Sequence, residues 1–126
     1  MRRKSKSPLR TLITNADRAL QDFFRATYPD DKCESCWRPA ELRHHYIEKS
    51  RSSLLRYCTK NLIAICKSCH AKHHLYGDPT VMGRVLKKRG MRWFNWVEKQ
   101  KTISIQLDEP FIRRCMKKLG IKLETQ

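Results

Sequence analysis

The segment ICKSCHAKHH, residues 65–74, contains two cysteines and three histidines within ten positions. Thiolates and imidazoles are the ligands that zinc and other transition metals prefer in proteins. A tetrahedral ion accepts four ligands, so this segment has more donors than one such ion can use. The count therefore predicts that the segment contributes to two metal sites of different kinds.

Two Cys-x-x-Cys pairs predict that one of these sites is a structural zinc. Each pair presents two thiolates from one tight turn, and two such turns can enclose Zn²⁺ tetrahedrally. The alternative is a set of buried, unligated thiols, which the repeated spacing disfavours. The four predicted ligands are Cys33, Cys36, Cys66 and Cys69. Cys58 and Cys115 have no partner cysteine close in sequence, and we expect both to be small core residues.

The histidines predict a second, open metal site. His70 and His74 are four positions apart in a predicted helix, so both imidazoles project from one face. His44, in a predicted neighbouring strand, could supply a third ligand and leave one position for water or a phosphate oxygen. His73 is the alternative to His74, although helical spacing favours His74. His45 follows His44 in the strand and points the other way, where it could act as a general base.

These residues resemble the HNH endonucleases, which have a ββα-metal fold. The resemblance covers about a third of the chain and is carried by the His44–His45 pair, Asn61 sixteen residues on, and then His70 and His74. It implies that His44, His70 and His74 bind the catalytic metal and that His45 is the general base. Asn61 would brace the loop between the two strands and hold that base. A four-cysteine zinc flanks the motif in a large subgroup of the family.

A weaker resemblance extends to phage recombination proteins of the NinG type and to zinc-bearing phage junction resolvases. It is carried by HYIEKSRSSLLRYCTKNLIAICKSCH and by KKRGMRWFNWVEK further along the chain. It implies a nuclease of branched recombination intermediates in the cytoplasm of a bacterium or phage-infected host. Its expected partners are a second copy of the chain, as a homodimer, and phage recombination or packaging proteins.

The identity of the catalytic metal depends on position 44. The HNH endonucleases often have an acidic residue there, and this chain has His44. Because imidazole is a softer ligand than carboxylate, we expect Mn²⁺, Ni²⁺ or Zn²⁺ to be favoured over Mg²⁺.

The charge of the chain predicts a polyanionic partner. Its 28 lysines and arginines outnumber 12 acidic residues, for a formal charge of +16. We expect DNA, held mainly through phosphate contacts that weaken steeply with salt. The predicted contacts are Lys49, Arg51 and Arg56 in a central loop and Arg2, Arg3 and Lys4 in an N-terminal arm. Residues 87–89 form a second basic run, for which a solvated face is the commoner interpretation.

Other partner classes have no signal in the sequence. No long apolar or amphipathic segment predicts a membrane anchor, and no RNA-binding module motif is present. No signal peptide is visible, and six cysteines without one indicate a reducing compartment.

The elements that must position these residues predict a small α+β protein. We expect a ββα-metal core with the four-cysteine zinc, flanked by an N-terminal helix and by C-terminal helices. The predicted units are a basic arm over 1–10, a helix over 11–31, the zinc-stapled core over 32–77 and a helical extension over 78–126. In the extension, TISIQL predicts a short strand or an extended linker.

Apolar spacing predicts which helix faces are buried. Trp93, Trp96 and Val97 fall on one face, where core packing is favoured over base stacking. Phe111, Cys115 and Leu119 recur at four-residue spacing in the last predicted helix, and we expect them to face the core.

The function expected from these features is metal-dependent hydrolysis of DNA phosphodiester bonds, by nicking or cleavage. The competing functions are a non-catalytic, zinc-stabilised nucleic-acid-binding module and a nuclease active only beside a phage partner. A non-catalytic module would be indicated by a missing base or ligand, and neither is missing. A specific site, a duplex nick and a four-way junction all stay open as substrates.

Overall fold

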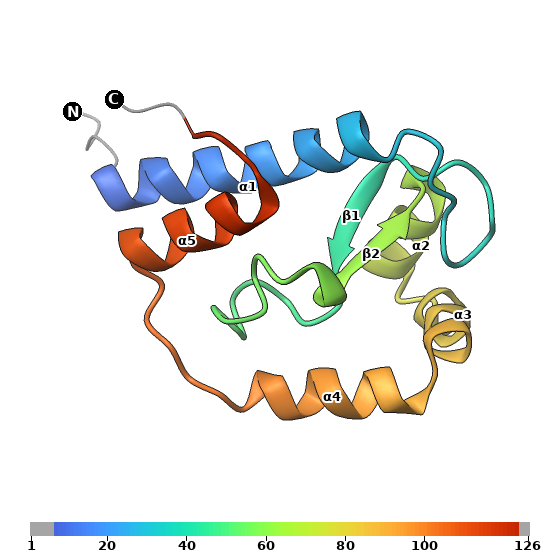
Figure 1. Cartoon of the computed structure of the whole chain (residues 1–126). Coiled ribbons are helices and arrows are strands. Elements are labelled where there is room, and N and C mark those ends of the chain that lie inside the picture. Colours follow the sequence, from blue (N-terminus) through green and yellow to red (C-terminus); the bar gives the residue numbers. More distant parts are fainter. Residues whose placement is uncertain (1–6, 124–126) are drawn as a thin grey trace, which may run out of the picture.

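The computed structural model describes residues 7–123 and has a small α+β fold. A two-stranded antiparallel sheet lies between a pair of helices from opposite ends of the described chain and three further helices (Figure 1). The elements are α1 (Pro8–Thr27), β1 (Leu42–His45), β2 (Leu62–Ile65), α2 (Lys67–Tyr76), α3 (Pro79–Arg89), α4 (Met91–Lys101) and α5 (Glu109–Leu119).

Helix α1 begins earlier than the sequence predicted. Ser7 caps it, because the Ser7 hydroxyl accepts a hydrogen bond from the Arg10 N–H at 3.2 Å, and Pro8 suits the first turn. Residues 8–10, which we expected to belong to a basic arm, are therefore helical. Residues 1–6 of that arm lie outside the described part of the chain. The buried face of α1 consists of Leu12, Ala16, Leu20 and Phe24.

The two strands and α2 form the predicted ββα unit. In the sheet, His44 lies opposite Ile63 and His45 opposite Leu62. Cys66 caps α2 by accepting a hydrogen bond at its Sγ from the Cys69 N–H. Gly77 ends α2 with a φ of 58°, a left-handed conformation that glycine adopts without steric cost.

Helix α5 packs against α1, and its most buried residues lie one position along from the stripe that its sequence spacing predicted. Ile112 and Met116 are the fully buried residues of α5, and they join the apolar face of α1 in one core cluster. Phe111, Cys115 and Leu119 are only partly buried at its border. The predicted stripe therefore packs against the core as expected, but the position of α1 buries the adjacent stripe more deeply. TISIQL forms no strand and is an extended connection before α5.

Helix α4 packs on the connection between the strands, residues 46–61, which we call the central loop. Val97 is fully buried against Ile47 and Leu55, and Trp93 and Trp96 pack around them. The prediction that both tryptophans are packing residues is confirmed. The core is thus divided into three small clusters, of which the central one is built around cysteines.

Candidate active site

The four predicted cysteines converge at the start of α2. Their Sγ atoms all lie within 4.8 Å of one another, and the Cys36 and Cys66 sulfurs are 3.6 Å apart. Zn–S bonds of about 2.3 Å in a tetrahedron place the sulfurs about 3.8 Å apart, so the donor set and its spacing fit zinc. Cys33, Cys66 and Cys69 are buried, as in a closed structural site.

The protonation of these thiols differs from one to the next. Burial raises the pKa of Cys69 to about 12. At Cys36 burial also acts to raise the pKa, but hydrogen bonds from the Arg38 backbone and the neighbouring sulfurs outweigh it and lower the pKa to about 7. A thiolate is therefore accessible at neutral pH within the cluster, and the thiolate is the form that binds zinc.

A second donor cluster joins β1 to α2. His44, His70 and His74 each offer a ring nitrogen, and these nitrogens lie within 4.8 Å of one another. Three imidazoles are a suitable ligand set for Zn²⁺, Ni²⁺ or Mn²⁺, with further positions left for water or substrate. His44 is buried, His70 is half-buried and His74 is exposed, so the cluster opens to solvent at one side. His73 lies beside it, with its ring centroid 5.0 Å from that of His44, but is not part of the converging set.

The environment keeps His44 neutral. Burial, followed by repulsion from His73, His70 and His74, lowers the pKa of His44 to about 3. Burial also lowers the pKa of His70. Neutral imidazole is the form that binds metals, so His44 does not need to lose a proton at neutral pH.

His45 points to the opposite side of β1, toward the central loop. Its Nε2 lies 2.7 Å from the backbone carbonyl oxygen of Arg56. A carbonyl oxygen can only accept, so Nε2 carries the proton and Nδ1 carries the free lone pair. Burial lowers the pKa of His45, partly offset by this hydrogen bond, which favours the charged form. The arrangement can accept a proton at Nδ1.

Asn61 ties the two ends of the central loop together. The side chain is fully buried, and its Oδ1 accepts from the Ile47 N–H at 2.8 Å. Its Nδ2 donates to the carbonyl oxygens of Ile47 at 3.0 Å and Leu55 at 3.2 Å. The loop that contains the Arg56 carbonyl is therefore fixed from within.

The histidines face a cleft of about 520 Å³ between α1, β1 and α2. His44, His45, His70 and His74 line it, together with Asp17, Arg18 and Gln21 of α1 and with Glu48 and Lys49 of the central loop. One wall of the cleft is thus formed by α1, which lies outside the histidine motif.

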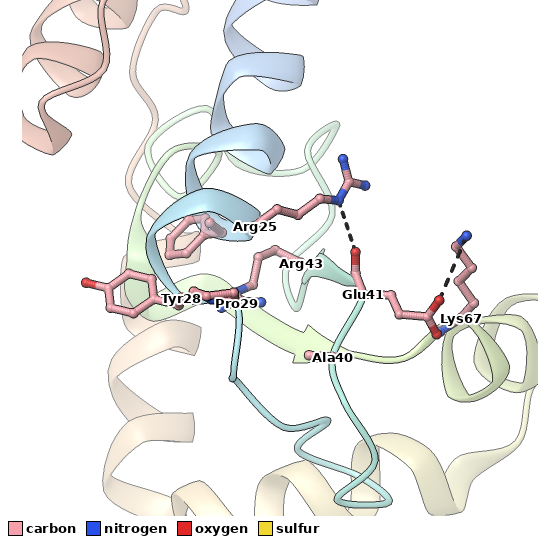
Figure 2. Close-up of a pocket in the computed structure, with 8 residues that line it drawn as sticks. Arg25, Tyr28, Pro29, Ala40, Glu41, Arg43 and Lys67 are labelled. Carbon is pink, nitrogen blue, oxygen red and sulfur yellow. Dashed lines mark hydrogen bonds and ion pairs between the residues drawn. The ribbon is translucent and has the colours of Figure 1, made fainter.

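A second hollow, of about 370 Å³, lies beyond the cleft at the end of α1 (Figure 2). There Arg25 donates to the Glu41 carbonyl oxygen at 3.2 Å, and Lys67 pairs with the Glu41 carboxylate at 3.8 Å. Arg43 is buried between Asp31, with which it pairs, and the ring of Phe24. This hollow contains neither of the metal-ligand clusters.

The predicted phosphate-binding residues differ in their availability. Lys49 lies at the cleft, half exposed, and Arg51 is well exposed. Arg56 is instead held in an internal ion pair with Asp17 and is only 14% exposed, so we do not retain it as a phosphate contact. Arg2, Arg3 and Lys4 lie outside the described residues.

Two acidic residues have important contacts that the sequence did not predict. Asp17 pairs with Arg56, 39 positions away, and Glu34 pairs with Arg89, 55 positions away. The run of charges at residues 87–89 had indicated a solvated basic face, but Arg89 does not belong to one. Ion pairs between residues so distant in sequence leave no local pattern.

A comparison with known protein families gives a match over about the central third of the chain. The family model described as HNH endonuclease matches residues 33–75, from the first cysteine to the residue after His74. No curated protein and no solved structure gives a significant match. Among the described residues, no helix is long and apolar enough to cross a membrane. The narrower NinG-type resemblance stays a prediction.

Proposed function

We propose that this chain, whose residues 33–75 form an HNH endonuclease domain, is a metal-dependent nuclease that hydrolyses DNA phosphodiester bonds. The supporting observation is the pairing of three converging imidazoles with a fourth, His45, whose Nδ1 is free to accept a proton. The two groups share one open cleft, as a metal and a general base must in order to act on the same phosphate.

The metal ligands in this proposal are His44, His70 and His74, and the structural zinc is held by the four cysteines. A divalent ion bound at the histidines supplies positive charge that offsets the negative charge developing as the P–O bond breaks. Mn²⁺, Ni²⁺ and Zn²⁺ suit an all-imidazole set better than Mg²⁺ does.

His45 is the proposed general base. It takes a proton at Nδ1 from the attacking water, and the Arg56 carbonyl stabilises the resulting imidazolium through Nε2–H. Asn61 contributes by fixing the central loop and makes no contact with the reacting atoms. The family resemblance implies products with 5′-phosphate and 3′-hydroxyl ends.

DNA is the proposed substrate because the chain has a formal charge of +16 and its domain family is that of endonucleases. Lys49, which lines the cleft, and the well-exposed Arg51 are the proposed phosphate contacts among the described residues. The organisation we propose is a core at 32–77 that performs the reaction and a helical extension at 78–126 that supports it. Branched substrates, a homodimer and a phage recombination or packaging partner follow from the resemblance alone.

The test compares wild type with His45→Ala on a supercoiled plasmid and on a synthetic four-way junction. Each reaction is run with EDTA, Mg²⁺, Mn²⁺ and Ni²⁺, and zinc content and DNA affinity are measured in parallel. Loss of a general base costs about 10²–10⁴-fold, so His45→Ala should cut at least about 100-fold more slowly while binding DNA as well as wild type does.

Two results would contradict the proposal. Wild-type protein that binds both DNAs and cuts neither with any metal would indicate the non-catalytic binding module or a partner-dependent enzyme. His45→Ala that cuts at the wild-type rate would assign the base to another residue.

A further inference from the structure

We propose that Asp17, in helix α1, is a positioning residue that holds the general base His45 through Arg56. Asp17 lies outside the HNH endonuclease segment, at residues 33–75, and does not touch His45. The inference rests on the proposed function for the role of His45, but the contacts that carry it are independent of any reaction.

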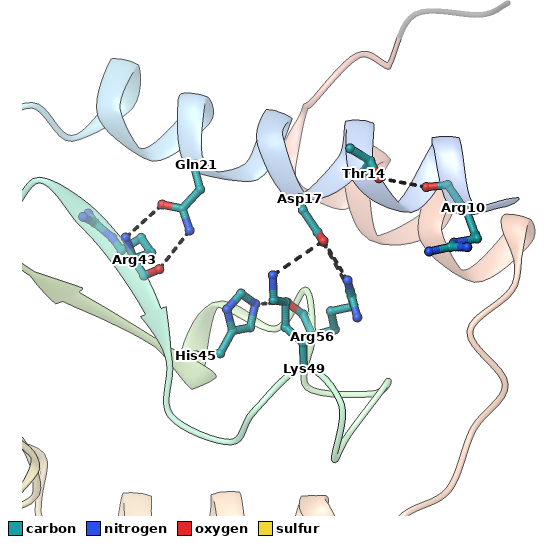
Figure 3. Close-up of polar contacts among 8 residues, drawn as sticks. All are labelled: Arg10, Thr14, Asp17, Gln21, Arg43, His45, Lys49 and Arg56. Carbon is teal, nitrogen blue, oxygen red and sulfur yellow. Dashed lines mark hydrogen bonds and ion pairs between the residues drawn. The ribbon is translucent and has the colours of Figure 1, made fainter. Parts of the chain in front are cut away.

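The contacts run from α1 to the central loop and then to β1 (Figure 3). The Asp17 carboxylate accepts two hydrogen bonds from one guanidinium, from Arg56 Nε at 3.2 Å and from Arg56 Nη2 at 2.7 Å. The backbone carbonyl of the same Arg56 accepts the hydrogen bond from His45 Nε2 at 2.7 Å. The residue that orients the base is therefore itself held by α1.

The Asp17–Arg56 pair has the properties of a fixed contact. It is bidentate and charge-assisted, which sets the orientation of the guanidinium as well as its distance. Arg56 is 14% exposed and Asp17 is 23% exposed, so water competes little for either group. Asn61 holds the loop one residue earlier, through the Leu55 carbonyl. With both contacts in place, the Arg56 carbonyl is fixed by its own side chain and by its neighbour.

A purely structural role, docking α1 on the sheet, is already served by another residue. Gln21 exchanges two hydrogen bonds with the backbone of Arg43, donating to its carbonyl oxygen at 2.8 Å and accepting from its N–H at 2.9 Å. The apolar face of α1 also packs into the core with α5. Asp17 is thus not required to set the position of α1, and its contacts are directed at the loop.

Loss of the Asp17 carboxylate should change DNA affinity and the rate of the chemical step in opposite directions. A residue that only stabilised the fold would not have this pair of effects. Asp17 Oδ2 lies 3.7 Å from Lys49 Nζ as well as 2.7 Å from Arg56 Nη2. Removing the charge of Asp17 takes an acidic neighbour away from Lys49, which lines the cleft and could then pair with a phosphate. The substitution should therefore strengthen DNA binding while it slows the chemical step.

The experiment compares Asp17→Asn with Asp22→Asn. Both substitutions remove one carboxylate from α1 without changing side-chain shape, but Asp22 is 65% exposed and pairs only with Arg25 on the same helix. DNA affinity and the single-turnover cleavage rate at saturating protein are measured for each. Long-range ¹H–¹⁵N spectra report the tautomer and Nε2–H exchange of His45, assigned by comparison with His45→Ala.

In Asp17→Asn, cleavage at saturation should fall about 10- to 100-fold, the usual cost of misplacing a reacting group. DNA affinity should be higher than that of wild type, and the His45 Nε2–H signal should exchange faster or give way to mixed tautomers. Asp22→Asn should match wild type in the spectra and in the cleavage rate. Arg56→Lys, which keeps the charge but not the two-point contact, should show a partial loss and serves if Asp17→Asn does not fold.

Unchanged His45 signals in a folded Asp17→Asn protein would overturn the inference, whether or not the enzyme cuts DNA. Cleavage by Asp17→Asn within about twofold of Asp22→Asn would overturn it too. If wild type itself does not cut DNA but the His45 signals change as expected, the coupling of Asp17 to His45 through Arg56 stands and the proposed function fails.

Discussion

At the scale of residues, the two adjacent histidines of β1 face different environments. Side chains alternate along a strand, so His44 turns toward α2 and His45 turns toward the central loop. His44 is surrounded by other imidazoles, which adds repulsion to the effect of burial, whereas His45 has a carbonyl oxygen as its partner. One residue of separation is therefore enough to give the two imidazoles the different environments that a metal ligand and a proton acceptor require.

The first prediction at this scale distinguishes His74 from His73. His74→Ala should weaken Ni²⁺ or Mn²⁺ binding at the histidine cluster by more than about tenfold, since even the loss of an outer partner costs about 10- to 100-fold. His73→Ala should bind close to the wild-type affinity, because its nitrogens do not converge with the other three. Calorimetric titration of zinc-loaded protein measures both. The reverse order of affinities would make His73 the ligand.

Much of the site could be predicted from short-range residue spacing. The Cys-x-x-Cys pairs and the four-residue interval from His70 to His74 are local patterns with one geometric meaning each. Asp17 could not be predicted, because nothing near it in the sequence indicates that α1 passes the central loop. Arg56 was predicted to bind phosphate for the same reason. The sequence shows a basic residue in a loop but does not show that the Asp17 carboxylate pairs with it in the fold.

At the scale of elements, Arg89 at the end of α3 connects the zinc turn to the sheet. Glu34, between the first two zinc cysteines, accepts hydrogen bonds from the Ala64 N–H of β2 and from Arg89. Arg89 also donates to the carbonyl oxygens of Lys60 at 2.9 Å and Leu62 at 2.8 Å. The Arg89 guanidinium therefore joins the end of α3 to the zinc turn and to the start of β2.

Arg89→Ala should therefore lower the free energy of unfolding by about 3 kcal/mol or more, because it leaves Glu34 buried without its cation. Lys101→Ala is the matched control, since it removes one cation from the half-exposed Lys101–Glu98 pair within α4 and should cost less than about 1 kcal/mol. Urea unfolding of both proteins with zinc present measures the difference. Similar values for the two variants would mean that Arg89 is no more than a surface charge.

The element boundaries also show what spacing alone can decide. Gly77 and the Asp78-Pro79 pair, which cap the end of α2 and the start of α3, are local signals that can be recognised without the fold. In α5, Phe111 and Cys115 pack against the core as expected, but Ile112 and Met116, which have the same spacing, are the more deeply buried pair. The position of α1 decides which of the two stripes is buried more deeply. The periodicity of the α5 sequence contains no information about that position.

At the scale of the whole molecule, the zinc cluster replaces a large part of a hydrophobic core. Three of the five buried residues in the central cluster are zinc-site cysteines, with only Ile65 and Val81 beside them. We therefore expect the part of the chain around this cluster to depend on zinc for folding.

Cys36→Ser should therefore yield protein with less than one zinc per chain and a melting temperature lower by about 10 °C or more, corresponding to about 2 kcal/mol. Cys58→Ser makes the same atomic change outside the cluster, at a half-buried position, and should keep its zinc. Zinc content by mass spectrometry and thermal unfolding by circular dichroism measure both. Full zinc occupancy in Cys36→Ser would show that three thiolates suffice.

The packing of α1 against α5 has a consequence for the order in which the chain is made. A ribosome adds about 5–20 residues per second, so α5 (Glu109–Leu119) follows α1 (Pro8–Thr27) by roughly 4–16 s. During that interval the apolar face of α1 lacks Ile112 and Met116. Chains released early would already contain every predicted metal ligand. They would lack α5, so α1, which holds Arg56 through Asp17, would not be fully packed. Nascent and truncated chains should therefore bind metal before they can cut DNA.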